Sequence, residues 1–237
     1  MRLELDALMD RARGVAEDRV AEIRVELPRE HELVPEVHAV ELQRAAAHQT
    51  LTALGLHALQ HRGQEAAGIV SFDGRRFHSE RRMGLVGDNF SERAVIDRLK
   101  GIAAIGHTRY STTGETILRN VQPLFAELDG GGFAVAHNGN ITNGITLRRH
   151  LIRSGAIYQS TSDTEVVLHL VAQSKKVKFV DRFIEAITQL EGAYSFVGLT
   201  NKKLVGARDP LGIRPLVLGE LDGCYILASE TCALDII

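Results

Sequence analysis

The chain of 237 residues has no tryptophan and only two cysteines, Cys224 and Cys232. Two cysteines do not make a disulfide framework, and no CxxC or HExxH spacing is present, so the sequence predicts no metal site. No apolar run approaches the ~18–20 residues that span a bilayer, and the acidic N-terminus is not a secretory signal. A net charge of −2 gives no reason to expect nucleic acid as a partner. These absences favour a reduced, cytoplasmic protein without membrane or nucleic-acid contacts.

One histidine pair is a candidate metal chelator. His57 and His61 stand four residues apart on a predicted helix, a spacing that can hold a metal ion. No carboxylate or third ligand lies nearby in the sequence. The pair is therefore interpreted as packed or surface histidines.

The sequence also lacks a GxGxxG or GxxxxGK[ST] phosphate loop and any βαβ alternation, which argues against a nucleotide-binding fold. Helices are predicted over 50–61, with Thr50 as N-cap, over 143–154, over 163–175, with Ser162 as N-cap, and over 180–190. Strands are predicted over 66–72, 76–79, 102–107, 132–137, 193–199, 203–207, 216–218 and 225–228, and Asp73-Gly74 predicts a hairpin turn between the first two. This order predicts an α+β fold, with helices covering both faces of mainly antiparallel sheets.

The first 50 residues differ from the rest. Residues 1–36 are dense in Arg, Glu and Asp, and their apolar positions are loosely helical in spacing. Pro28 and Pro35 interrupt the pattern. We expect a solvated helix and then a poorly ordered stretch, in a segment of about 50 residues that need not belong to the core fold.

Three short polar segments follow apolar strands or open a helix, and each offers one binding group. Arg109 can clamp a carboxylate, Asn138 and the Gly139 N–H can stabilise an oxyanion, and Asp163 can accept from an ammonium group. Each has a structural alternative: an ion pair for Arg109, a hairpin turn for Asn138-Gly139, and helix capping for Asp163. Together the groups suit an amino acid with a carbonyl to be attacked, and glutamine fits. The segments are GHTRYSTTG at 106–114, HNGN at 137–140 and TSDTE at 161–165.

Eight ordered motifs then point to a family. They are LQHRGQEAAGI at 59–69, GHTRYSTTG at 106–114, RNVQP at 119–123, AHNGNITN at 136–143, TSDTEV at 161–166, GAYSF at 192–196, ARDPLGIRPL at 207–216 and ASETCALD at 228–235. From about residue 51 to residue 237 the chain resembles the N-terminal class II glutaminase domain of the amidophosphoribosyltransferases. The glucosamine-6-phosphate synthase glutaminase is the alternative, but QHRGQE and RYSTTG favour the purine enzyme.

The resemblance implies the four-layer αββα sandwich of the N-terminal-nucleophile hydrolases. Family members hydrolyse glutamine and pass ammonia to a C-terminal domain, where it converts phosphoribosyl pyrophosphate to phosphoribosylamine for purine synthesis. By motif, Arg109 would bind the glutamine α-carboxylate with support from Thr112, Asp163 would bind the α-ammonium, and Asn138 with Gly139 would form the oxyanion hole. Family enzymes are homo-oligomers. Mg²⁺ and any iron–sulfur cluster would belong to the C-terminal domain, so no cofactor is expected within this sequence.

The sequence departs from the family at the nucleophile. Family members use an N-terminal cysteine in a CG(V/I)FG strand, and counting back about 24 residues from His61 reaches Val37, where no cysteine stands. Residues 1–49 contain no Cys, Ser or Thr. We therefore expect a fragment with an altered 5′ coding region and no phosphoribosyltransferase domain, impaired in catalysis. A non-catalytic glutamine-binding or regulatory module is the alternative. Whether 37–42 pairs in a sheet stays open.

Overall fold

The computed structural model describes residues 22–25, 35–41, 48–110 and 117–237. Its strands are β1 Glu22–Val25, β2 Glu36–Glu41, β3 Ala66–Phe72, β4 Phe77–Met83, β5 Ala103–Arg109, β6 Leu124–Leu128, β7 Gly131–Ile141, β8 Gly192–Thr200, β9 Lys203–Arg208, β10 Val217–Leu221 and β11 Cys224–Ala228. The helices are α2 His48–Ala58, α3 Val86–Phe90, α4 Arg93–Arg98, α5 Gly144–Arg153, α6 Glu165–Gln173, α7 Phe179–Ile187 and α8 Cys232–Asp235, with 3₁₀ turns η1 Gln60–Arg62 and η2 Leu118–Asn120.

The strands form antiparallel sheets. The largest has the order β1-β2-β9-β8-β7-β6, a second has the order β4-β3-β5, and β10 pairs with β11. Short turns join β3 to β4, β6 to β7, β8 to β9 and β10 to β11, as antiparallel pairing allows, whereas the neighbours β7 and β8 are joined through α5, α6 and α7.

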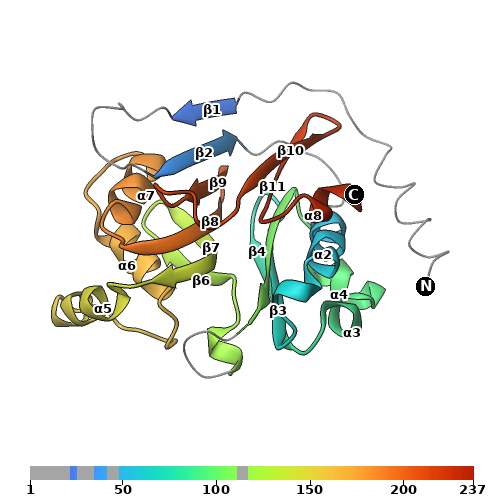
Figure 1. Cartoon of the computed structure of the whole chain (residues 1–237), viewed down its shortest axis with the longest axis horizontal. Coiled ribbons are helices and arrows are strands. Elements are labelled where there is room, and N and C mark those ends of the chain that lie inside the picture. The colour runs from blue at the N-terminus through green and yellow to red at the C-terminus, as the bar shows by residue number, and fades with distance from the viewer. Residues whose placement is uncertain (1–21, 26–34, 42–47, 111–116) are drawn as a thin grey trace.

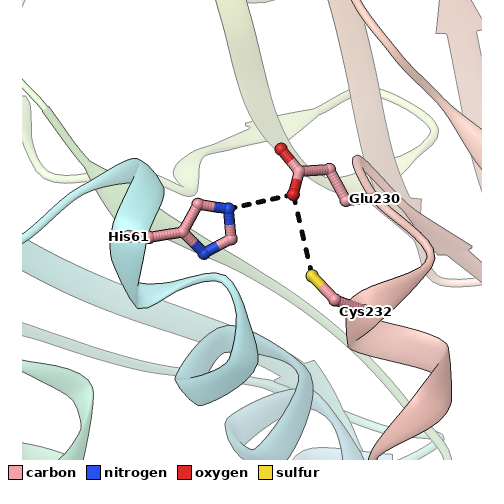
Figure 2. A group of neighbouring side chains, drawn as sticks. All are labelled: His61, Glu230 and Cys232. Atoms are coloured by element: carbon pink, nitrogen blue, oxygen red, sulfur yellow. Dashed lines mark hydrogen bonds and ion pairs between the residues drawn. The ribbon is translucent and has the colours of Figure 1, made fainter.

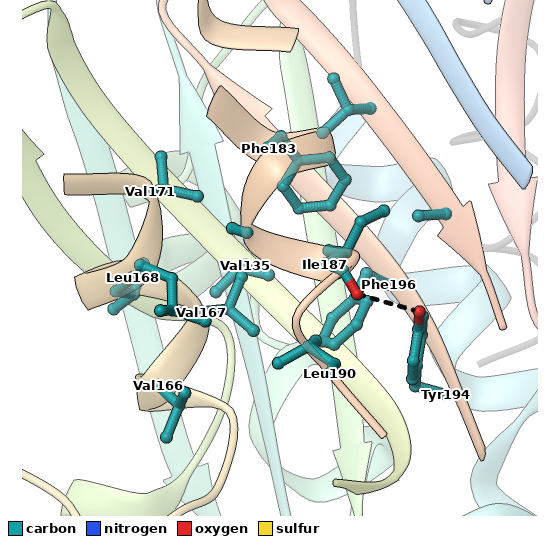
Figure 3. Close-up of a cluster of buried hydrophobic side chains, with 14 of the residues drawn as sticks. Val135, Val166, Val167, Leu168, Val171, Phe183, Ile187, Leu190, Tyr194 and Phe196 are labelled. Atoms are coloured by element: carbon teal, nitrogen blue, oxygen red, sulfur yellow. Dashed lines mark hydrogen bonds between the residues drawn. The ribbon is translucent and has the colours of Figure 1, made fainter. Parts of the chain in front are cut away.

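Helices and sheets are stacked in four layers (Figure 1). Helices α6 and α7 pack on one face of the six-stranded sheet, through residues such as Val167, Phe183 and Phe196 (Figure 3). A second cluster, including Val70 and Leu199, joins the two larger sheets face to face. A third joins α2, α3 and α4 to β3. This arrangement confirms the expected αββα sandwich.

One buried hydroxyl fixes the helical layer to the sheet. Tyr194 of β8 is 1% exposed, and its hydroxyl donates to the Ile187 carbonyl at the end of α7, over 3.2 Å. Figure 3 shows this bond among the apolar side chains. Because a buried Tyr hydroxyl needs a partner, this bond fixes where α7 ends over β8.

The predicted hairpin is present, and its turn is stabilised by one carboxylate. Asp73 Oδ1 accepts the backbone N–H groups of Arg75 and Arg76, each over 2.7 Å, and Gly74 has a positive φ of 93°. Hydrogen bonds from His78 and these two N–H groups lower the pKa of Asp73 to about 2. The Asp-Gly signal therefore identified the turn correctly.

Two predicted helix caps are wrong. Helix α2 begins at His48, so Thr50 lies inside the helix, buried, and is not its N-cap. Helix α6 begins at Glu165 after Thr164, and the Ser162 hydroxyl accepts the Thr164 N–H over 3.3 Å. In both places the pattern gave the helix but not its first residue, since helix ends are set by neighbouring packing.

The N-terminal region differs from the helix expected there. Residues 22–25 form β1, a strand, and the rest of 1–34 lies outside the described residues. Residues 36–41 form β2, which pairs antiparallel with β9 from Glu36 opposite Arg208 to Glu41 opposite Lys203. The pairing left open by the sequence is therefore formed. Within the described ranges, no helix is long and apolar enough to cross a bilayer.

Candidate functional site

Four of the predicted binding residues converge on one cavity of about 570 Å³. Arg109 reaches it from β5, Asn138 and Gly139 from β7, and Asp163 from the loop before α6. A cavity of this size falls within the range of small-ligand pockets, roughly 300–1,000 Å³. Residues from three separate segments thus form one site.

Asn138 and Gly139 lie within strand β7, where they pair with Ser195 and Tyr194 of β8. This position excludes the hairpin-turn alternative. Gly139 has φ 148°, and a Cβ there would lie 2.1 Å from the Ala193 carbonyl oxygen, so no other residue fits. Among the described residues, buried Asn138 Nδ2 has no hydrogen-bond partner. A buried donor without a partner is costly, and an oxyanion would satisfy it.

Asp163 is held against the end of β7. Its Oδ2 accepts the Ile141 N–H over 3.0 Å, and its Oδ1 lies 3.7 Å from His137 Nδ1. Burial raises the pKa of Asp163, but His137 and the Ile141 N–H outweigh it and hold the pKa below its ordinary value. The group is therefore a carboxylate at neutral pH, able to accept from an ammonium group.

Arg109 is the last residue of β5 and is only 4% exposed. Its Nη1 donates to the Asn120 carbonyl over 3.0 Å. Burial lowers the pKa of Arg109, while the charges of Glu65 and Asp163 oppose that shift. The guanidinium thus remains charged, in a buried position where a carboxylate ligand would be strongly bound.

Asn120 connects two walls of the site, and sequence reasoning gave it no role. Its Nδ2 donates to Thr161 Oγ1 over 2.8 Å, and its Oδ1 accepts the Thr161 N–H over 2.9 Å. Since its carbonyl also holds Arg109, Asn120 fixes the distance between the Arg109 and Asp163 segments. Its place in the RNVQP motif was the only signal.

Gln122 has a similar positioning role. Its Oε1 accepts the His137 N–H over 2.7 Å, and its Nε2 donates to Thr164 Oγ1 over 3.0 Å. The carboxamide therefore ties β7, next to Asn138, to the residue that precedes α6. Such fully bonded buried networks fix a single arrangement of a site.

His107 supports β7 from the opposite sheet. Its ring Nε2 donates to the His137 carbonyl over 3.1 Å. Burial, with the nearby charges of His137 and Arg109, lowers the pKa of His107 to about 4. The ring is therefore neutral at neutral pH, and it adds no charge beside Arg109.

The nucleophile position predicted near Val37 lies away from these groups. Val37 is 2% exposed and belongs to the cluster that packs against α6 and α7. Its neighbour Glu36 pairs with Arg208, which pairs with Ser195, which pairs with Asn138. Three strand spacings separate Glu36 from Asn138, about 14 Å. Strand β2 thus brings no side chain to the oxyanion donors.

Both cysteines are free thiols of partial burial. Cys224 lines the cavity, and burial with the charges of Asp222 and Glu220 raises its pKa. Burial and the nearby Glu230 raise the pKa of Cys232 as well. Both groups are therefore thiols at neutral pH, a state that is poorly nucleophilic. Thr112, predicted to support Arg109, lies outside the described residues.

Two strand edges border the cavity. Residues of β5 line it from one side and residues of β11 from another. In the part of the chain that the structure describes, β5 pairs only with β3, and β11 only with β10. Each strand therefore has one unpaired backbone edge at the cavity, and an added extended segment could pair with such an edge.

Comparison with known proteins agrees with this geometry. The sequence profile of the glutamine amidotransferase domain family matches residues 107–235. The chain is 70% identical over 187 residues to the amidophosphoribosyltransferase of Rhizobium etli, covering 79% of this chain and 38% of that protein. It is 53% identical over 189 residues to the chloroplastic amidophosphoribosyltransferase of Glycine max, covering 79% and 33%.

Solved structures give the same result for the fold. The glutamine phosphoribosylpyrophosphate amidotransferase of B. subtilis, complexed with ADP and GMP, is 39% identical with a TM-score of 0.76. The match covers 84% of this chain and 43% of that one. The chain thus spans less than half the length of these relatives, over which it shares both sequence and fold.

Proposed function

Because the chain belongs to the glutamine amidotransferase domain family, we propose that its cavity binds glutamine, as the glutaminase half of an amidophosphoribosyltransferase. Arg109 binds the α-carboxylate and Asp163 the α-ammonium. The γ-carboxamide oxygen then faces Asn138 Nδ2 and the Gly139 N–H. The observation that carries the proposal is the buried Asn138 Nδ2, which has no partner within the described part of the chain, in the same cavity as a buried guanidinium and a carboxylate.

The electrostatics favour a zwitterion over a simple carboxylic acid. Asp163 and buried Arg109 present opposite charges to one cavity. An amino acid satisfies both charges at once, whereas a ligand that lacks the ammonium leaves Asp163 unpaired. Discrimination by such an unpaired buried group is far stronger than discrimination by apolar fit.

The proposed activity of these 237 residues is glutamine binding with impaired hydrolysis. Residues 1–49 hold no Cys, Ser or Thr, and both cysteines have raised pKa values. The absence of these nucleophiles and the raised pKa values together favour the alternative function, a glutamine-binding or regulatory module without turnover. Hydrolysis would need a nucleophile delivered beside Asn138, and the space between the edges of β5 and β11 suits an added strand.

The remaining parts of the proposal concern the whole protein. In the relatives' reaction, ammonia from glutamine would be transferred to phosphoribosyl pyrophosphate in purine synthesis, and this chain would supply the glutamine side of that transfer. The cytoplasm is the proposed location. We propose no resident cofactor for the glutamine site itself, since its charged and polar groups already match the ligand.

Calorimetric titration of L-glutamine tests the binding proposal. We expect saturable 1:1 binding by the unchanged chain, and at least ~30-fold weaker binding by Asp163→Ala, since removing one partner of a buried charge pair costs about 2–5 kcal/mol. Asp129→Ala is the matched control because Asp129 pairs with Arg182 elsewhere on the surface. Equal affinity of the unchanged chain and Asp163→Ala would refute the assigned role of Asp163.

A glutaminase assay tests the impairment separately. The unchanged chain should release no ammonia above background. Replacing the residues before α2 with a strand that begins Cys-Gly-Val-Phe-Gly should restore hydrolysis if the rest of the site is intact. If the unchanged chain releases ammonia, and the Cys224→Ser and Cys232→Ser variants release it equally well, another group acts as nucleophile.

A further inference from the structure

Three possible metal ligands meet where His61 and Glu230 line the cavity. They are His61 of η1, Glu230 before α8, and Cys232 at the first position of α8 (Figure 2). Their ligand atoms all lie within 4.8 Å of one another. The sequence predicted no metal site because His61 and Glu230 are 169 positions apart, so no local spacing could show the group.

The distances suit a tetrahedral ion. His61 Nε2 lies 2.9 Å from Glu230 Oε2, and Cys232 Sγ lies 3.7 Å from the same oxygen. Zinc bonds of about 2.0–2.3 Å at tetrahedral angles place ligand atoms about 3.3–3.7 Å apart. Only small side-chain movements therefore separate the observed arrangement from a three-ligand site. Figure 2 shows that the side chains of His61, Glu230 and Cys232 are turned toward one another.

The orientation of His61 is the second observation. Its Nδ1 lies 3.1 Å from the Ala58 carbonyl oxygen, which can only accept, so Nδ1 carries a proton. In a neutral ring, Nε2 then carries a lone pair, and this lone pair faces Glu230 Oε2. A proton or a metal ion must lie between these two acceptors. Metal-binding histidines commonly have this arrangement, in which the other ring nitrogen donates to a backbone carbonyl.

The second oxygen of Glu230 is already bound. Arg62 Nη1 donates to Glu230 Oε1, which leaves Oε2 as the single oxygen free to turn toward His61 and Cys232. A guanidinium in this position orients a carboxylate ligand from outside the coordination sphere. A zinc ion with one carboxylate and one thiolate is neutral, so the group with Arg62 carries a single positive charge.

We propose that His61 Nε2, Glu230 Oε2 and Cys232 Sγ bind one zinc ion, with water in the fourth position. The mixed nitrogen, oxygen and sulfur donors match the preferences of zinc. Binding forms three metal–ligand bonds and releases to the solvent the Cys232 thiol proton and the proton between Nε2 and Oε2. No oxidation or reduction takes place.

The ion would join two distant parts of the chain. His61 and Glu230 both line the cavity, His61 after α2 and Glu230 before α8. Leu59, which follows α2, packs in one buried cluster with Ala228 at the end of β11 and Ala233 of α8. A metal cross-link at this place would hold the rim of the cavity closed on that side. None of the three ligands is among the proposed glutamine-binding residues Arg109, Asn138 and Asp163.

Cobalt(II) is the probe, because it replaces zinc and reports its ligands by absorption. The reduced full chain is titrated with cobalt(II), then with zinc(II) in competition. We expect one equivalent to bind, with a thiolate-to-cobalt charge-transfer band and tetrahedral d–d bands that zinc removes. Cys232→Ser should abolish the charge-transfer band, and His61→Gln should weaken binding at least ~10-fold.

Two matched controls make the result specific. Cys224→Ser removes the other free thiol, and His57→Gln removes the imidazole one turn earlier on α2; both should keep the bands. Far-ultraviolet circular dichroism checks that each variant is folded. Absence of the charge-transfer band in the unchanged chain, its survival in Cys232→Ser, or its loss in Cys224→Ser would overturn the proposal. The assay does not use glutamine, so its failure leaves the proposed function standing.

Discussion

Replacing Gly139 by alanine should destabilise the protein more than almost any other single methyl addition. Gly139 has φ 148°, and an added Cβ would lie 2.1 Å from the Ala193 carbonyl oxygen and 2.8 Å from the Tyr194 Cα. Both neighbours are backbone atoms of β8, so no flexible side chain can move aside. Strand β7 would have to separate from β8 at the centre of the six-stranded sheet.

The magnitude follows from two additive causes. A backbone conformation reserved for glycine costs about 1–3 kcal/mol in another residue, and overpacking costs a further ~1–3 kcal/mol. We take about 3 kcal/mol as the expected loss in the free energy of unfolding. In a protein of this size each kcal/mol lowers Tm by roughly 2–4 °C, so Gly139→Ala should lower Tm by roughly 6–12 °C.

Thermal and urea unfolding, followed by circular dichroism, measure this change. Gly130→Ala is the control, since a Cβ there meets nothing within 4 Å. It should shift Tm by less than about 2 °C, because exposed substitutions usually change stability by under ~0.5 kcal/mol. A difference of roughly 2 °C in Tm is the scatter expected of a neutral change. If the Tm of Gly139→Ala lies within about 2 °C of the Tm of Gly130→Ala, the close packing of β7 on β8 is refuted.

Three further predictions concern buried polar groups. Burial raises the pKa of Glu165, but His169, whose Nε2 lies 3.8 Å from Glu165 Oε1, and hydrogen bonds from Ser160 bring it to about 2, against an ordinary value of 4.5. Its carboxylate therefore stabilises the fold fully above about pH 4.5, and the free energy of unfolding falls by roughly 3 kcal/mol as the pH drops to 2. In Glu165→Gln the free energy of unfolding, measured in urea, should depend less on pH over this range. An unchanged pH dependence would contradict the assigned pKa. The His107 ring should titrate near pH 4 by NMR, and a midpoint near 6.5 would show that it is not buried. Tyr194→Phe should cost about 0.5–1.5 kcal/mol, the net value of one buried hydrogen bond, because the Ile187 carbonyl keeps the Leu190 N–H as a donor; a neutral change in urea unfolding would show that the Tyr194 bond is absent.

Much of the fold could be predicted from residue patterns, because most elements have a clear period. The Asp73-Gly74 turn, the buried strand that becomes β5, and the amphipathic α7 were all found close to their observed bounds. Helix starts were less certain: Thr50 and Ser162 have the right chemistry for caps, but packing against other elements set the ends elsewhere. At residues 22–25, helical spacing in a charged segment did not reveal a strand, because strand pairing is a long-range contact.

The site could be predicted only in part. Arg109, Asn138, Gly139 and Asp163 have side chains or backbone groups whose chemistry is visible in the sequence, and the structure brings them to one cavity. Asn120 was missed because its function depends on a carbonyl and a carboxamide that bridge distant segments.

The position of the nucleophile could not be predicted from the sequence. Counting along the sequence reached Val37, yet the pairing order of the strands separates β2 from the oxyanion donors by two further strands. Sequence distance gives a position along the chain, whereas only sheet order gives the position in space. The same holds for His61, Glu230 and Cys232, whose proximity arises entirely from the fold.

The most direct test of the central claim is a crystal structure of the chain with L-glutamine. The account predicts the α-carboxylate against Arg109, the α-ammonium against Asp163, and the γ-carboxamide oxygen within hydrogen-bond distance of Asn138 Nδ2 and the Gly139 N–H. Glutamine bound outside this cavity, or bound in it with the carboxamide against Arg109, would contradict the account.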